Sequence, residues 1–106
     1  MITITVHSRN DEKLYSLLIN KEYELRTKKR GSFIRRSGKS RLSKDIWVHK
    51  KYPGWVKFNK GINGSISCST QTKNEGDEWQ IFEAFISFLQ RYFHKQIASI
   101  NITFDN

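Results

Sequence analysis

The stretch DEWQIFEAFISFLQRYFHKQ, residues 77–96, decides the fold class of this chain. Its polar residues recur at the spacing of an α-helix and form one narrow stripe. They are Gln80, Glu83, Ser87, Gln90, Arg91 and His94. The apolar arc is therefore much wider than the roughly 100° of an ordinary surface helix. Asp77, followed three residues later by Gln80, resembles a capping box. The sequence predicts a long helix that is covered on most sides, by a curved sheet or by a second copy of the chain.

Alternating segments lie on both sides of this helix. ITITVH (2–7) and IASINITF (97–104) alternate apolar and polar residues, which predicts two half-buried strands, with the second beside the first. The stretch from 45 to 72 predicts three strands, separated by a turn at Pro53-Gly54 and by the GING turn. SRNDEKLYSLLIN (8–20) predicts a short helix with Leu14, Leu17 and Leu18 on one face, capped by Ser8, Asn10 or Asp11.

These elements predict a single α+β domain over residues 1–106. An antiparallel sheet of about five strands packs on one long C-terminal helix. A short helix follows the first strand, and a C-terminal strand closes the sheet. At 106 residues the chain has room for one hydrophobic core.

The composition and the N-terminus exclude several classes of protein, such as membrane-spanning and disulfide-rich ones. The N-terminus does not resemble a signal peptide, no apolar run reaches the 18 or so residues of a membrane span, and Cys68 is the single cysteine. We therefore expect a cytoplasmic protein without an internal disulfide. His7, His49 and His94 and this cysteine lack metal-ligand spacing, so no metal and no cofactor are expected.

The net charge of +9 is concentrated in residues 26–44, which hold nine basic residues and no acid. The remaining ten basic residues balance the ten acids. RRSGKSR (35–41) ends like a phosphate-binding loop, but Phe33 stands where the first glycine of that motif belongs. Tyr23 and Leu25 could begin a strand that pairs with SFIRR (32–36). We expect segment 26–44 to be a loop or an arginine-rimmed hairpin that binds polyanions.

Aromatic residues alternate with lysines just after this segment, so bases could stack while cations hold phosphates. At least two of Trp47, Tyr52, Trp55 and Phe58 should nevertheless face the core, because half of the residues in a strand point inward. The predicted nucleic-acid-binding residues are Arg26, Lys28, Lys29, Arg30, Arg35, Arg36, Lys39, Arg41, Trp47, Lys50, Lys51, Tyr52 and Trp55.

The function predicted first is a small non-enzymatic module that binds nucleic acid or another polyanion. The alternative is an inhibitor or adaptor that docks on an acidic protein partner. A third hypothesis is a small metal-free ribonuclease, in which His49 would act with Lys51, Arg35 or Arg36, and with Glu24 or Glu83. This third hypothesis requires a histidine within hydrogen-bond reach of the basic segment.

The motifs HKKYPGWVKF, DEWQIFEAFISFLQRYF and IASINITF together resemble small bacterial proteins of the kind carried on integron gene cassettes. This resemblance implies a compact accessory protein of the bacterial cytosol and transfers no site residue. The wide apolar arc of residues 79–93 adds the expectation of a homodimer through the C-terminal helix.

Overall fold

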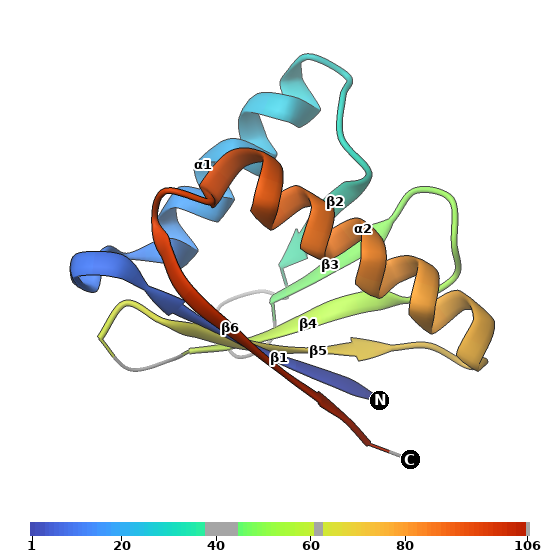
Figure 1. Ribbon diagram of the computed structural model, residues 1–106. Helices are drawn as coiled ribbons and strands as arrows, with labels where there is room; N and C mark the ends of the chain where they lie inside the picture. The colour runs from blue at the N-terminus through green and yellow to red at the C-terminus, as the bar shows by residue number, and fades with distance from the viewer. Residues whose placement is uncertain (38–44, 61–62, 106) are drawn as a thin grey trace.

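The computed structural model describes residues 1–37, 45–60 and 63–105. Six strands form one open antiparallel sheet, and two helices pack on one face of it (Figure 1). The strand order is β2-β3-β4-β5-β1-β6. The strands are β1 Ile2–Ser8, β2 Phe33–Ser37, β3 Asp45–His49, β4 Trp55–Lys60, β5 Ile66–Gln71 and β6 Ile97–Phe104. The helices are α1 Leu14–Thr27 and α2 Glu75–Phe93.

The predicted α+β class is confirmed, with a helix after the first strand, a long C-terminal helix and a closing strand beside the first one. The sheet has six strands, because Phe33–Ser37 pairs along its length with β3. The hairpin that we expected between Tyr23–Leu25 and SFIRR is wrong, since the partner of β2 is β3 and residues 38–44 connect the two.

Strand alternation divides the sheet into a helix-side face and an open face. On the helix-side face, apolar side chains of all six strands meet the apolar sides of both helices. The buried strand residues are Ile2, Ile4, Val6, Phe33, Trp47, Val56, Phe58, Ile66, Cys68 and Ile97. Each such side chain contributes about 1.5–3 kcal/mol on burial, so this layer supplies most of the stabilising free energy. The open face has no helix over it (Figure 1).

Helix α1 is longer than the sequence indicated. Leu14, Leu18 and Leu25 are buried at helical spacing, and that long-range period outweighs the short alternation over Tyr23–Leu25. None of Ser8, Asn10 and Asp11 caps it: a 3₁₀ turn occupies Arg9–Asp11, and no side chain caps the helix at Lys13.

The main chain supplies that missing cap. The N–H of Leu14 donates to the carbonyl of Gly64 at 3.2 Å. Gly64 has φ +80°, and a Cβ there would lie 2.1 Å from the Glu12 oxygen, so this approach requires glycine.

The N-cap of helix α2 lies three residues earlier than expected. The Oδ1 of Asn74 accepts from the N–H of Asp77 at 3.0 Å, so Asn74 is the N-cap and the Asp77–Gln80 capping box is wrong. Asn74 suits the position because its short side chain reaches the first unpaired N–H groups. Among the described residues, no helix is long and apolar enough to cross a membrane.

Candidate nucleic-acid interface

The open face presents side chains in rows that the strand register defines. Three rows cross it. The first is Ile34, Val48, Trp55 and Gln71. The second is Arg36, Ile46, Lys57, Ser69, Thr3 and Thr103. The third is Asn59, Ser67, Thr5 and Asn101. One end of the face is therefore apolar and cationic, and the rest carries hydroxyls and amides. No strand residue on the open face is acidic in the described part of the chain.

Trp55 is the aromatic side chain of this face, and it is 40% exposed. Lys57 lies two residues along the same strand on the same face. Arg36 lies in the row of Lys57 with β3 between them, a main-chain separation of about 10 Å. Ile46 lies between these two cations, and Trp55 lies in the neighbouring row, next to Lys57 along β4. An aromatic plane with cations nearby offers stacking for a base and counter-charges for the adjacent phosphates.

The turn before Trp55 is built on a neutral histidine. The Nδ1 of His49 accepts from the main-chain N–H groups of Lys51 at 2.9 Å and Tyr52 at 3.1 Å. Burial, and then the charge of Lys51, lowers the pKa of His49, which keeps Nδ1 free to accept. The turn ends at Gly54, with φ +138°, where a Cβ would lie 2.7 Å from the carbonyl oxygen of Gln71.

A second group of cations lies at the same end of the sheet. The main-chain N–H of Lys50 donates to the carbonyl of Ser32 at 2.9 Å, and its Nζ donates to the carbonyl of Arg30 at 3.2 Å. These contacts bring the 28–30 segment beside the 50–54 turn. Lys29, Arg30, Lys50 and Lys51 are exposed, and none forms an ion pair with a carboxylate of the described residues.

Three of the predicted cations pair with carboxylates of the protein. Arg26 pairs with the buried Glu22 at 3.0 Å, and Lys28 pairs with Glu24 at 3.2 Å. The third, Arg35, points to the helix side. Exposed helical pairs contribute only about 0.3–0.5 kcal/mol, so Lys28 can exchange Glu24 for a phosphate at small cost.

Arg35 holds a buried carboxylate. Its Nε donates to the Oδ2 of Asp45 at 2.8 Å, and the hydroxyl of Tyr15 donates to the same oxygen. Burial raises the pKa of Asp45 to about 6. This cluster fastens β2 and β3 to α1, so Arg35 is part of the framework and Arg36, the next residue, is on the open face.

The aromatic residues of the prediction also divide. Trp47 is 0% exposed and packs on Phe58 at 5.0 Å between ring centroids, so it cannot reach a ligand in this fold. The expectation that at least two of the four aromatics face the core is confirmed by Trp47 and Phe58. Tyr52 is half-buried against His49 at 5.1 Å.

Lys39 and Arg41 lie outside the described residues. Lys57 is one of the lysines that alternate with the aromatic residues, and for which the sequence predicted a phosphate contact. Its neighbours Val56 and Phe58 are buried, so Lys57 lies on the open face.

The geometry that a ribonuclease needs is not assembled in the described part of the chain. His49 is committed to its turn, His7 lies on β1 and His94 follows α2. Within the described ranges, no hydrogen bond joins any of the three histidines to a basic side chain. No group of three metal-ligating side chains occurs there either. Burial raises the pKa of the Cys68 thiol, which disfavours the nucleophilic thiolate.

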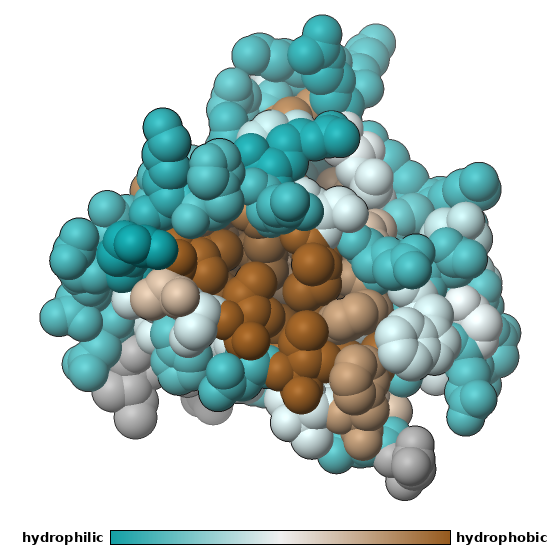
Figure 2. All heavy atoms as spheres, in the orientation of Figure 1, coloured by the Kyte–Doolittle hydropathy of each residue, from teal (hydrophilic) through white to brown (hydrophobic). Residues whose placement is uncertain are grey.

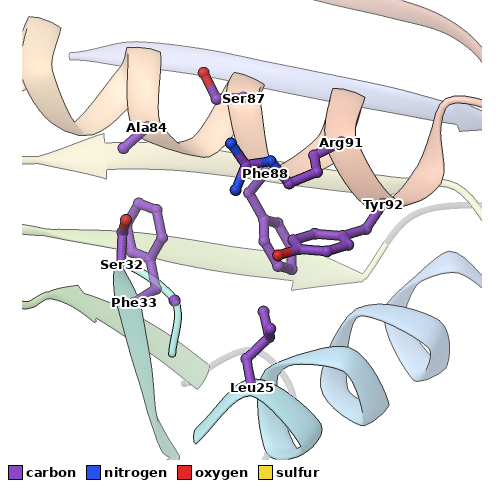
Figure 3. Close-up of a pocket in the computed structure, with 9 residues that line it drawn as sticks. Leu25, Ser32, Phe33, Ala84, Ser87, Phe88, Arg91 and Tyr92 are labelled. Carbon is purple, nitrogen blue, oxygen red and sulfur yellow. The ribbon is translucent and has the colours of Figure 1, made fainter. Parts of the chain in front are cut away.

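A small pocket lies on the other side of the molecule, between the end of α1, the start of β2 and α2 (Figure 3). Figure 3 shows Leu25 and Tyr92 facing one another across it, with Phe33 and Phe88 at its wall. Its volume of about 130 Å³ is well below the 300–1,000 Å³ of typical ligand pockets. The open face is the better candidate site.

Comparison of the chain with protein-family models, with curated proteins and with solved structures finds no match. The similarity to integron-cassette proteins stays a prediction.

Proposed function

We propose that this protein is a small non-enzymatic module that binds nucleic acid across the open face of its sheet, in the cytoplasm. Trp55 stacks on a base, and Arg36 and Lys57 hold phosphates beside it. Arg30, Lys50 and Lys51 continue the contact at the end of the sheet. Lys39 and Arg41 add charge from the connection between β2 and β3.

The observation that carries the proposal is the composition of the open face. A surface left uncovered by both helices has an exposed tryptophan and two cations, and its described strand residues include no acid. Arginine and lysine neutralise phosphates, and aromatic planes stack on bases of any sequence. Polar hydroxyls and amides further along the face can bond to sugar and base edges.

The shape of the site favours single strands. A sheet face is too broad for the 12 Å major groove of B-DNA, whereas unpaired bases can lie flat on a strand-borne aromatic. We therefore expect tighter binding of single-stranded RNA or DNA than of a duplex. With this surface, sequence preference should be weak and salt dependence strong.

Fluorescence anisotropy with labelled single- and double-stranded RNA and DNA tests the proposal. The key variant is Arg36→Gln/Lys57→Gln, which leaves the core and the Asp45 cluster intact. The matched control is Lys13→Gln/Arg91→Gln, which removes the same charge at exposed positions on the helix side. Titrations at about 50 and 200 mM salt cover the range in which several phosphate contacts weaken binding strongly.

The expected result is salt-dependent binding that the key variant weakens at least tenfold more than the control does. Equal weakening by both variants would show a diffuse charge effect and overturn the open-face site. No binding at low salt would overturn the nucleic-acid proposal and favour docking of the basic surface on an acidic protein.

A further inference from the structure

An apolar surface is exposed on the opposite edge of the molecule from β2. We call it the β6 patch: Trp79, Phe82 and Ile86 on α2, with Ile100, Ile102 and Phe104 on β6. Figure 2 shows a continuous hydrophobic area over β6 and the neighbouring flank of α2, where the isoleucines and phenylalanines of this patch lie. Trp79 is 50% exposed, Phe104 52% and Ile102 38%.

The patch is an ordered surface. The rings of Trp79 and Phe104 are stacked at 5.3 Å between centroids, and Phe82 meets Phe104 edge-on at 6.0 Å. An apolar area that is contiguous across a helix and a strand is typical of an interaction site. Helix α2 buries only one side of its wide apolar arc against the sheet.

The strand in this patch has a free edge. β6 pairs with β1 on one side, and its other side has no neighbour in the described sheet. It is eight residues long and has neither a charged residue nor proline. Proteins normally protect an exposed edge with charges, proline or brevity. β2, the other edge strand, has five residues and two arginines.

The hydrogen-bond pattern shows which groups of β6 point outward. Met1 and Asp105 exchange both main-chain bonds, at 2.9 and 3.2 Å. Such pairs alternate along an antiparallel ladder, so the N–H and C=O groups of 99, 101 and 103 face β1. Those of Ile100, Ile102 and Phe104 face the free edge. These three residues also place their side chains on the helix-side face.

We propose that two copies of this protein pair antiparallel through their β6 edges. Outward-pointing residues can bond only to outward-pointing residues, so Ile100, Ile102 and Phe104 of one copy meet the same set in the other. Their apolar side chains then lie on one face, between two α2 helices. Polar Ser99, Asn101 and Thr103 lie together on the open face.

The charges around the patch identify a second copy as the partner. One end carries Glu75, Asp77, Glu78 and Asp105, which outnumber Lys73 and the N-terminal ammonium there, and the other carries Arg9 and Lys95. A two-fold axis reverses β6 and brings the acidic end of one copy beside the basic end of the other. An isologous interface requires this self-complementarity, and β6 supplies it in side chains, charge and hydrogen bonds.

The size of the surface agrees with this partner. Two half-exposed aromatic side chains offer about 100 Å² each. Further exposed area comes from Ile102, Met1 and the main chain along the strand edge. A standard interface buries roughly 800 Å² per partner. The two sheets become one continuous sheet, and both open faces stay uncovered, with the β2 edges at its two ends.

Amide hydrogen exchange of the wild-type chain, followed over micromolar to millimolar concentrations beside sedimentation equilibrium, tests this dimer. The amides of 99, 101 and 103 are bonded to β1 in either state and serve as the internal control. We expect a dimer mass at high concentration, with the amides of Ile100, Ile102 and Phe104 protected. Dilution to monomer should remove protection from these three alone.

Ile102→Lys tests the same interface by mutation, with Thr103→Lys as its control on the opposite face. A lysine at 102 must be buried among apolar groups, so self-association should weaken about 100-fold or more. Thr103→Lys should change it little. Continued protection of 99, 101 and 103 shows that a variant is folded. If a variant does not fold, the dilution series of the wild-type protein alone tests the proposed dimer. A wild-type monomer at millimolar concentration with unprotected 100, 102 and 104, or a dimer that persists in Ile102→Lys, would overturn the proposal.

Discussion

The two faces of the sheet use the same residue types for opposite purposes. Trp47 and Arg35 lie on the helix-side face, where one fills the core and the other neutralises Asp45. Trp55 and Arg36 lie on the open face, where each has room for a ligand. The difference teaches that burial, set by register, decides whether a basic and aromatic segment supports the fold or is available for binding.

The tryptophan pair should give the largest contrast in stability. Trp47→Ala removes a fully buried indole and leaves a cavity, so it should lower the free energy of unfolding by about 3–5 kcal/mol. Trp55→Ala should cost less than about 1 kcal/mol, yet lose the stacking contribution of about 1–3 kcal/mol to nucleic-acid affinity. Urea unfolding and anisotropy measure the two effects. Comparable destabilisation by both variants would break the comparison.

The arginine pair should give the next contrast. Arg35→Gln leaves the Asp45 carboxylate buried with Tyr15 alone, and should cost about 2–3 kcal/mol of stability. Arg36→Gln should change stability by less than about 0.5 kcal/mol and weaken nucleic-acid binding. Equal stability of the two variants would contradict the assignment of Arg35 to the framework.

Sequence reasoning recovered most of the architecture, because it depends on periodicity that a single chain displays. The apolar run of α2, the alternation of β1 and β6 and the Pro53-Gly54 turn each identify their element locally. The Asn74 cap was missed because Asp77 offered an equally good local pattern. The end of α1 was missed because the three residues Tyr23–Leu25, taken alone, fit the alternation of a strand. Their helical period becomes visible only over the twelve residues from Leu14 to Leu25.

The site was harder to predict. The alternation of residues along a strand separates the two faces of the sheet, but it does not show which face the helices cover. Trp47 and Trp55 occupy similar positions in neighbouring strands. The register Trp47↔Val56 then places Trp55 on the opposite face. That register depends on a turn shaped by His49 and Gly54, which composition does not reveal. The same register places Lys57 on the open face.

A single lysine should show the open face through its salt dependence. Lys57→Gln removes one phosphate contact, so the slope of log affinity against log salt should become shallower by about 0.7 for a single strand. Stability should stay within about 0.5 kcal/mol of wild type. An unchanged slope would remove Lys57 from the interface, and the Lys13→Gln variant gives the background for an exposed lysine elsewhere.

The smallest effect concerns the turn that carries Trp55. The folded pKa of His49 lies below its ordinary value of 6.5, so on acidification the unfolded chain takes up the proton first. The stability contribution of neutral His49 is therefore present above pH 6.5 and decreases as the pH falls below it. The free energy of unfolding should fall less between pH 7 and pH 5 in His49→Asn than in the wild-type protein. Asparagine retains a hydrogen-bond acceptor but does not take up a proton. An identical difference in the two proteins would show that His49 does not contribute.

The three tryptophans provide the most direct test, because each reports on a different surface: Trp47 on the core, Trp55 on the open face and Trp79 on the β6 patch. We would follow their indole N–H signals in a ¹H–¹⁵N spectrum while adding a short single-stranded RNA. The account predicts that the Trp55 signal shifts and the Trp47 and Trp79 signals do not. Shifts confined to Trp79, or a bound RNA that leaves Trp55 unmoved, would contradict the open face as the binding site.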